Sequence, residues 1–299
     1  MPKCDPMAAL DLVYNPVSGS FSQSHLDALV GALEGQGFVV TPMPTTAEGA
    51  QLSGSADLVC VHGGDGTLRD TVQALAERAG ETPLCVAPSG TINLVARELG
   101  YARKPAAFAA DLRAAWERGR DTWVQSPLYR LGEMPIVSCL SIGPDSHAVA
   151  RVDGKLKQRI GRYAYVVALA QQMRDWPRDT MTIRGELANG QPFEYEAEAA
   201  IVSHAALYAG PFQVSPEAAL AADSVELITL KRSTRMGTIA LSLAVMLRLP
   251  VAKLGIAEIR SCRRIEFDRC VTPVQVDGDH MPDCAYAIGP SGITLSYVV

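Results

Sequence analysis

The first part of the chain alternates short apolar runs with segments of helical periodicity. Four runs are almost continuously apolar, as is typical of strands covered on both faces: Ala9–Tyr14, Phe38–Val40, Asp57–Val61 and Pro83–Ala87. Apolar residues three or four positions apart predict helices over Leu26–Leu33, Thr67–Arg78 and Ile92–Leu99. Repeated strand–helix units indicate a three-layer α/β domain with a parallel sheet, which we assign to residues 1–125.

The pattern changes near Trp123. The later strands are more numerous and alternate between apolar and polar residues, which is typical of antiparallel sheets. We expect them at Pro135–Ile142, Thr180–Arg184, Phe193–His204, Val225–Leu230, Glu258–Phe267, Pro273–Val276 and Ile293–Val298, with helices at Ile160–Trp176 and Thr234–Leu249. Residues 126–299 are therefore predicted to form a sandwich-like antiparallel domain, with the last residues packing back on the first domain.

Composition narrows the class of protein. A length of 299 residues favours two domains, and a formal charge of 27 − 32 = −5 argues against a nucleic-acid binder. The seven cysteines are single and odd in number, which favours reduced thiols and a reducing compartment. The longest apolar stretch, Met236–Leu249, is shorter than the ~20 residues that span a bilayer, and Met1–Leu10 lacks the features of a secretory signal. We expect a cytoplasmic protein, at most peripheral to the inner face of the membrane.

A glycine-rich segment lies between the third predicted strand and the helix that follows it. Gly63, Gly64 and Gly66 allow the backbone to approach a ligand closely, and the helix N-terminus behind them suits phosphate. Thr67 can cap that helix or contact a phosphate oxygen. Asp65 would repel bare phosphate, so we expect it to face a metal ion, a ribose hydroxyl or a water on Mg²⁺. The segment fits neither the G-x-G-x-x-G dinucleotide pattern nor the Walker pattern. The alternative to a phosphate-binding function is a tight strand–helix turn that requires glycines for its backbone alone.

Two further segments occupy equivalent places after other strands. Pro88–Asn93 follows the fourth strand, and it contains Gly90, Thr91 and Asn93. Asn15 opens an Asn-Pro-Val-Ser-Gly segment after the first strand. Ligands of parallel α/β sheets bind outside the carboxyl ends of the strands, so these segments predict one phosphate-binding cleft. Taken singly, they are also compatible with an ordinary helix start and a Pro-Gly turn.

These motifs, together with later ones, resemble the diacylglycerol kinase catalytic-domain family. The later motifs are Ser141-Ile142-Gly143, Gly161-x-x-x-Tyr165, the G-P-F-x-x-x-P-x-A segment at 210–218 and Val276-Asp277-Gly278. Members of this family phosphorylate lipids such as diacylglycerol, sphingosine and ceramide. The resemblance implies a nucleotide-binding α/β domain like that of NAD kinases, a β-sandwich domain, an active site in the cleft between them, and the use of ATP and Mg²⁺.

The resemblance also implies roles for individual residues. Nucleotide contacts fall on Thr45, on the segment from Gly64 to Asp70 and on Thr91, with Asn15 nearby. We add Gly63, Gly90 and Asn93 of the same turns to the candidate nucleotide-binding residues. The general base falls on Asp279 of Asp277-Gly278-Asp279. From its own place in the glycine-rich turn, we expect Asp65 to be a second catalytic carboxylate that orders the metal through water. A metal site of one carboxylate and two backbone carbonyls falls on Leu220, Asp223 and Val225.

The chain departs from the family pattern at several positions. Asp279 stands in place of the usual glutamate, Leu94 in place of an aspartate, and Ala222 and Ser224 flank Asp223 where the family has D-D-G. Two alternatives therefore stay open beside an ATP-dependent lipid kinase. One is a soluble-substrate kinase such as an NAD kinase, against which the D-G-D and G-P-F motifs argue. The other is a nucleotide- or lipid-binding protein without turnover.

A lipid acceptor implies contact with a membrane surface. Two basic runs, Arg151–Arg162 and Lys231–Arg235, could attract anionic headgroups, although charge runs are commonly solvated faces. We expect Met236–Leu249 to be a packed helix and not a membrane anchor. No nucleic-acid partner is expected, and a homodimer is left open.

Overall fold

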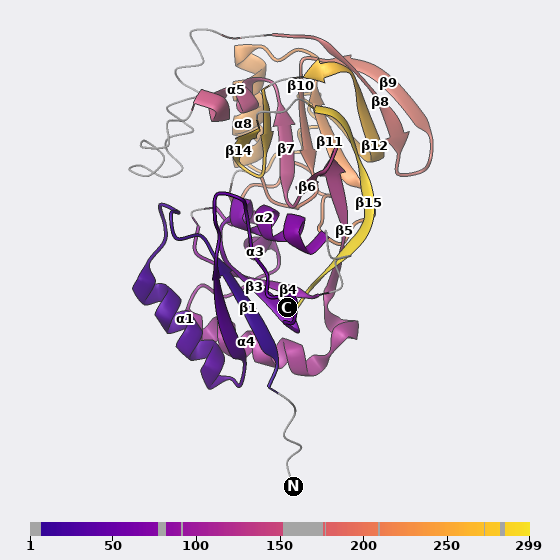
Figure 1. The fold of residues 1–299 in the computed structure, drawn as a ribbon. Helices are drawn as coiled ribbons and strands as arrows, with labels where there is room; N and C mark the ends of the chain where they lie inside the picture. Colours follow the sequence, from indigo (N-terminus) through magenta and orange to yellow (C-terminus); the bar gives the residue numbers. More distant parts are fainter. Residues whose placement is uncertain are drawn as a thin grey trace. The chain divides into compact units, whose positions relative to one another are not determined.

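The computed structural model describes residues 7–76, 82–90, 92–151, 176, 178–208, 210–271, 273–281 and 285–299. The chain divides into two compact units (Figure 1). Unit 1 consists of residues 1–126 and 293–299, and unit 2 of residues 127–292. The C-terminal residues therefore belong to the same unit as the first strand.

Unit 1 is built on a parallel sheet. Its strands are β1 (Ala9–Tyr14), β2 (Val39–Pro44), β3 (Leu58–Gly63) and β4 (Leu84–Pro88). Their order is β4-β3-β1-β2, and every neighbouring pair is parallel. All residues of β3 and β4 are buried, as predicted from their continuous apolar runs, whereas β2 is an edge strand that contains two prolines.

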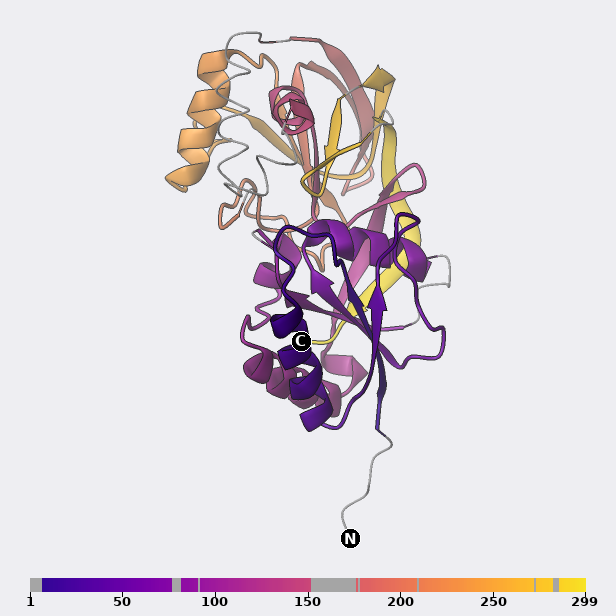
Figure 2. The same ribbon diagram turned by 60° about the vertical axis from the view of Figure 1, so that its left-hand side comes forward.

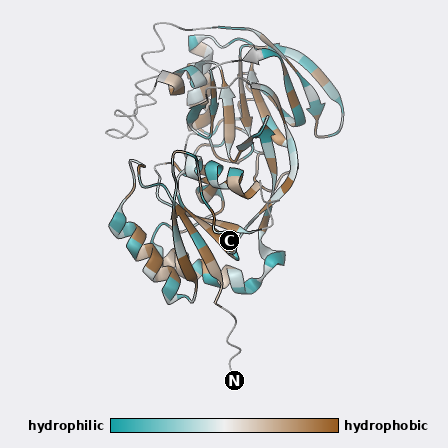
Figure 3. Cartoon of the chain, viewed as in Figure 1, coloured by the Kyte–Doolittle hydropathy of each residue, from teal (hydrophilic) through white to brown (hydrophobic). Residues whose placement is uncertain are grey.

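Helices cover both faces of this sheet. One face packs against α1 (Gln23–Gly35) and α4 (Pro105–Arg118) through a cluster that includes Leu58 and Cys60 of β3. Because side chains alternate along a strand, the equally buried Val59 and Val61 face the other side. There α2 (Asp65–Ala76) packs against β3, and the short α3 (Leu94–Glu98) packs against β4. The predicted three-layer α/β arrangement is confirmed, and Figure 3 shows the apolar strands at its centre.

Unit 2 is an antiparallel sandwich of two sheets that share the long, irregular strand β12 (Glu258–Val271). One sheet has the order β14-β13-β7-β10-β11-β12, and the other joins β12 to β8 and β9 and, through β15, to β5 and β6. The bounds are β5 Val124–Leu131, β6 Met134–Ile136, β7 Cys139–Ile142, β8 Met181–Leu187, β9 Pro192–Ala197, β10 Ala199–Ser203, β11 Val225–Leu230, β13 Val274–Val276, β14 Asp279–Met281 and β15 Ala285–Tyr297.

The core of unit 2 lies between its sheets. Leu140, Val202 and Leu227 from the first sheet share one cluster with Ile183 and Ile288 from the second. The outer face of the first sheet carries α5 (Pro144–Arg151) and α8 (Arg235–Met246), and α8 is seen at the outside of this unit in Figure 2. None of the described helices is long and apolar enough to cross a bilayer.

Several predicted elements differ from the observed ones. The predicted strand Pro135–Ile142 is divided into β6 and β7, because the backbone amides of Val137 and Ser138 donate to the Asp277 carboxylate and not to a neighbouring strand. The predicted strand Phe193–His204 is likewise divided into β9 and β10. The predicted helix Ile160–Trp176 falls almost entirely outside the described residues, as do Thr91 and the Gly161-x-x-x-Tyr165 motif.

Candidate phosphate-binding turns and a carboxylate hairpin

The carboxyl ends of the four parallel strands bring the predicted unit 1 residues to one edge of the sheet. Asn15 follows β1, Thr45 follows β2, Gly64 follows β3 and Ser89 follows β4. From β1 the chain proceeds to β2 on one side, and from β3 it proceeds to β4 on the other. The boundary between β1 and β3 is therefore a topological switch point, the place where open α/β sheets bind ligands.

The first glycine turn is closed by Thr67. A Cβ atom on Gly63 would lie 2.5 Å from the Thr67 Cβ, so glycine is required at position 63. Thr67 is only 7% exposed and lies inside α2, which begins at Asp65. Its side chain supports the turn from behind and does not cap the helix.

The second glycine turn is held by Asn93. This residue is 2% exposed and has a left-handed backbone with a φ of 51°. Its Oδ1 accepts from the Gly90 amide at 3.0 Å, and its Nδ2 donates to the Gly90 carbonyl at 2.5 Å. Asn93 therefore fixes the shape of the turn from inside.

The two turns touch through their glycines. A Cβ on Gly90 would lie 3.0 Å from the Gly64 Cα and 2.6 Å from the Asn93 Oδ1. The Ser89 amide also donates to the Gly63 carbonyl at 3.3 Å. A side chain at position 90 is therefore excluded, and the glycine at position 64 also leaves bare backbone where the turns meet, which fits the close approach of a phosphate.

Asp65 joins the first turn to the second. Its Oδ2 accepts from the Leu94 amide at 2.9 Å and its Oδ1 from the Val95 amide at 3.3 Å. These amides open α3, so the carboxylate caps the helix that follows the second turn. The sequence suggested a metal or ribose partner for Asp65, whereas the described contacts give it a positioning function.

The other predicted contacts of unit 1 are local. The Asn15 Oδ1 accepts from the Val17 amide at 3.0 Å, which makes an Asx turn after β1. The Thr45 amide donates to the Tyr14 carbonyl at 2.8 Å, which holds the end of β2 beside the end of β1.

A buried histidine lies directly before the first glycine turn. His62 is 3% exposed, its ring stacks on His25 with centroids 5.3 Å apart, and its Nδ1 has no hydrogen-bond partner among the described residues. Burial, together with His25, lowers the pKa of His62 to about 4. His62 is therefore neutral near pH 7 and adds no positive charge to the turn.

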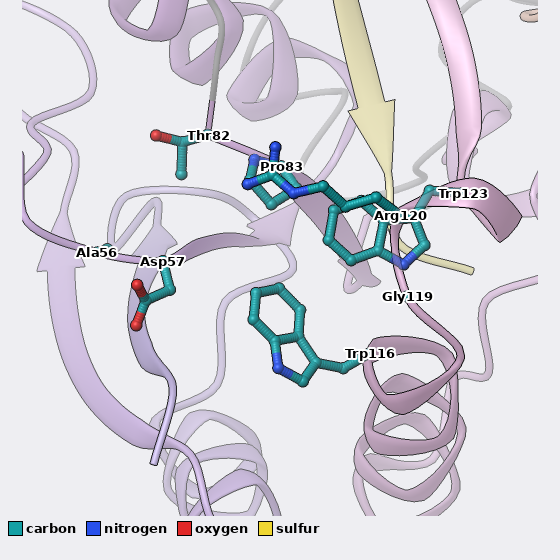
Figure 4. Close-up of a pocket in the computed structure, with 8 residues that line it drawn as sticks. All are labelled: Ala56, Asp57, Thr82, Pro83, Trp116, Gly119, Arg120 and Trp123. Atoms are coloured by element: carbon teal, nitrogen blue, oxygen red, sulfur yellow. The ribbon is translucent and has the colours of Figure 1, made fainter. Parts of the chain in front are cut away.

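A pocket of about 510 Å³ lies at the opposite edge of the unit 1 sheet (Figure 4). It is lined by Asp57 and Pro83, which precede β3 and β4, and by Trp116, Arg120 and Trp123. The two indoles stack with centroids 5.4 Å apart, and the Arg120 guanidinium lies 5.7 Å from the Trp123 ring. Since it opens at the amino ends of the strands, about 15–20 Å from their carboxyl ends, it is separate from the glycine turns.

The predicted base belongs to a two-residue hairpin of unit 2. Val276 pairs with Asp279 across the turn, and Asp277 and Gly278 have φ values of 52° and 87°. Asp277 is buried, and its carboxylate accepts from the amides of Val137, Ser138 and Cys139 and from the Ser138 hydroxyl. Asp279 is partly exposed. The structure thus gives Asp277 a structural function and leaves Asp279 as the accessible carboxylate of this motif.

A polar cluster beside the hairpin was not singled out from the sequence. The Asp145 Oδ2 accepts from the Ser141 hydroxyl at 2.6 Å and from the Tyr208 hydroxyl at 2.5 Å, and α5, which carries Asp145, packs against β13 and β14. Burial and the Asp145 carboxylate raise the pKa of Tyr208 well above its ordinary value, so its hydroxyl stays a donor. The Ser141-Ile142-Gly143 motif was the sequence signal closest to this cluster.

The predicted metal-binding stretch lies just before β11 in unit 2. Leu220 is buried, Asp223 is exposed and Val225 is the first residue of β11. The Asp223 carbonyl accepts from the Tyr129 hydroxyl at 2.8 Å. The described residues contain no group of three or more histidine, cysteine or acidic side chains arranged to hold a metal ion. The carboxylate and carbonyl donor types suit Mg²⁺ or Ca²⁺, but only one charged donor is present.

Comparison with known proteins identifies the first unit. Residues 9–122 match the model of the diacylglycerol kinase catalytic domain. This part of the chain is similar to that family. The diacylglycerol kinase catalytic domain thus covers β1 to α4 and contains both glycine turns.

Full-length relatives extend the comparison. A diacylglycerol kinase of Bacillus subtilis is 33% identical over 108 residues, which cover 33% of this chain and 36% of the relative. A diacylglycerol kinase of Staphylococcus saprophyticus is 27% identical over 168 residues, 52% of either chain. The matched region thus spans between about a third and a half of these relatives.

A solved structure agrees in fold over the whole chain. The crystal structure of a diacylglycerol kinase from Bacillus anthracis superposes with a TM-score of 0.72 and 18% identity, covering 98% of both chains. The diacylglycerol kinase catalytic domain and the antiparallel sandwich therefore occur in the same order in a known fold.

Proposed function

We propose that this chain is an ATP-dependent lipid kinase that transfers the γ-phosphoryl group to the hydroxyl of a lipid such as diacylglycerol, sphingosine or ceramide. The observation that carries the proposal is the contact between Gly64 and Gly90 at the carboxyl edge of the unit 1 sheet. Both glycines lie within residues 9–122, which match the diacylglycerol kinase catalytic domain. The names of the curated relatives support the same reaction class.

The unit 1 residues would bind and orient the nucleotide. Backbone amides of the two glycine turns and the N-terminus of α2 present partial positive charge to phosphate oxygens. Asn93 and Asp65 hold the turns in place through the hydrogen bonds described above. Phosphoryl transfer depends mostly on positioning and charge stabilisation, so rigid turns are the main contribution of this unit.

The unit 2 carboxylate would take the proton. As the acceptor oxygen bonds to the γ-phosphorus and the bond to the ADP oxygen breaks, the hydroxyl proton passes to Asp279. General-base catalysis of this kind contributes roughly 10²–10⁴ in rate. Aspartate is one methylene shorter than the family's glutamate, so the acceptor hydroxyl must lie correspondingly nearer to the hairpin.

Mg²⁺ would neutralise charge on the transferred phosphoryl group. Within unit 1, Asp65 would order this ion through water while its carboxylate oxygens accept the amides of Leu94 and Val95. In unit 2, Asp223 with the carbonyls of Leu220 and Val225 is the proposed structural metal site.

The proposal is tested by incubating the protein with radiolabelled ATP, Mg²⁺ and mixed micelles of diacylglycerol, ceramide or sphingosine, with NAD in a parallel reaction. Label in a lipid is the expected result and also identifies the substrate. Label in the NAD product alone would assign a soluble-substrate kinase. ATP binding without label in any acceptor would show a binding protein without turnover.

A further inference from the structure

The helix α8 is apolar on both of its sides. Its inner side packs on the outer face of the first unit 2 sheet, where Leu241 and Val245 share a cluster with Ile228 and Leu230. Its outer side carries Met236, 73% exposed, and Leu243, 52% exposed. A surface helix ordinarily turns polar residues outward, so this outer side is unusual.

The apolar surface continues past the end of the helix. We call it the α8 face, and it consists of Met236, Ile239, Leu243, Met246, Leu247, Leu249 and Leu254. These seven are the majority of the eleven exposed large apolar side chains in the described part of the chain, and they lie within 19 residues. Such a concentration marks an interaction surface.

The charge around the α8 face is opposite to that of the chain. Residues 231–255 contain five cations, which are all exposed, and no aspartate or glutamate, whereas the whole chain has a formal charge of −5. Lys231, Arg232 and Arg235 lie at the start of α8, and Arg248 and Lys253 follow its end. An exposed apolar stripe bracketed by cations is the pattern of helices that lie in the interface of anionic membranes.

We propose that the α8 face docks on an anionic lipid bilayer, with its apolar side chains at the acyl boundary and its five cations at the headgroups. A second copy of the chain is a poorer occupant, because a twofold interface would place the five cations of one copy against those of the other. The inference extends the proposed function, since a lipid kinase must reach an acceptor in a membrane, but its test measures binding and not turnover.

The experiment is co-sedimentation of the full chain with vesicles, without ATP. We expect binding to vesicles of phosphatidylcholine mixed with phosphatidylglycerol, weaker binding to phosphatidylcholine alone, and a loss of binding at high salt. Met236→Ser combined with Leu243→Ser should weaken binding at least about tenfold, because both exposed apolar anchors are lost. Arg232→Gln, Arg248→Gln and Lys253→Gln together should weaken it about 100-fold, at roughly fivefold for each cation.

A matched control removes exposed apolar side chains elsewhere. Met7→Ser combined with Tyr286→Ser replaces side chains that are 67% and 61% exposed. This variant should bind anionic vesicles as tightly as the unaltered chain does. Absence of binding to anionic vesicles, or undiminished binding by the Met236→Ser, Leu243→Ser variant, would overturn the proposal. So would a dimer in lipid-free solution that dissociates in that variant, because the face would then belong to a second copy.

A second readout separates this inference from the proposed function. Phosphorylation of a short-chain acceptor in solution should be unchanged in the α8-face variants, because no bilayer is involved. If the chain phosphorylates no lipid but binds anionic vesicles through α8, the docking surface stands and the kinase proposal fails. If it phosphorylates the short-chain lipid but does not bind vesicles, the kinase proposal stands and the docking surface fails.

Discussion

The Asp65 carboxylate accepts the Leu94 backbone amide at 2.9 Å, across 29 residues of sequence. This contact fastens the helix that leaves the second glycine turn to the helix that leaves the first. It also explains why an acidic residue stands in a turn suited to phosphate, because the carboxylate is directed toward α3. Together with the hydrogen bond from the Ser89 amide to the Gly63 carbonyl, this buried side chain therefore helps to set the spacing between the two glycine turns.

Asp65→Asn should weaken both stability and nucleotide binding. The new amide would place an NH₂ group against a backbone N–H of Leu94 or Val95, and an unsatisfied buried donor costs ~1–3 kcal/mol. We expect a lower midpoint in urea denaturation and a raised KM for ATP. Asp27→Asn on the exposed side of α1 removes the same charge and should change neither. Unaltered ATP kinetics in Asp65→Asn would remove this residue from the site.

Gly90→Ala should disrupt the contact between the turns. Its Cβ would come 2.6 Å from the Asn93 Oδ1 and 3.0 Å from the Gly64 Cα, so at least one turn must move. We expect ATP affinity, measured by calorimetry, to fall at least tenfold. Gly31→Ala is the matched control, because a Cβ there meets nothing within 4 Å. It should keep full affinity and stabilise α1 by up to about 1 kcal/mol.

Replacing each hairpin aspartate by asparagine should affect a different property, stability for Asp277 and catalytic rate for Asp279. Asp277→Asn loses an acceptor for buried amides and should lower the free energy of unfolding by ~1–3 kcal/mol. Asp279→Asn should leave stability within about 0.5 kcal/mol and lower kcat for lipid phosphorylation by about 10²-fold or more, with ATP affinity unchanged. Denaturation curves and initial rates on both variants decide the assignment. Full activity in Asp279→Asn would show that another group is the base.

The free energy of unfolding should decrease as the pH is lowered from about 6.5 to about 4. Burial lowers the pKa of both His62 and His204 to about 4, whereas the unfolded chain takes up these protons near pH 6.5. Since the unfolded state binds more protons in this window, acidification favours unfolding, and the stability is fully present above about pH 6.5. For each histidine, the free energy of unfolding falls by about 1.4 kcal/mol per pH unit across this window.

Single variants test this pH dependence. His62→Phe and His204→Phe should each flatten the plot of unfolding free energy against pH, whatever they do to stability at pH 7. Slopes from urea denaturation at several pH values provide the measurement. An unchanged slope in both variants would show that other groups govern acid sensitivity.

The sequence predicted the parallel strands because their signal is local. The bounds of β1 are those expected, since both of its faces are buried and its apolar run is continuous. Helix α4 was missed because half of its buried residues are alanines, Ala109 and Ala115, which stand beside Phe108 and Leu112. Alanine contributes little to an apolar periodicity, although it lets the helix approach α1 closely.

The candidate site was predicted only as far as its motifs are contiguous. Glycine turns and the Asp277-Gly278 hairpin follow from short strings with fixed backbone requirements. The partners of the carboxylates do not, because the Leu94 amide and the Tyr208 hydroxyl come from 29 and 63 residues away. Such contacts exist only once the fold has brought the segments together, so the capping of α3 by Asp65 could not be predicted from the sequence, and the ligand predicted for Asp65 stays a prediction.

The location of the C-terminal residues has a consequence for biosynthesis. Tyr297 pairs with Leu84, the Val298 amide donates to the Leu84 carbonyl, and the Tyr101 hydroxyl donates to the Val298 carbonyl. All of unit 2 is translated before these residues are made. Unit 1 therefore cannot complete its pairing at the β4 edge until residues 293–299 have been synthesised, after the whole of unit 2.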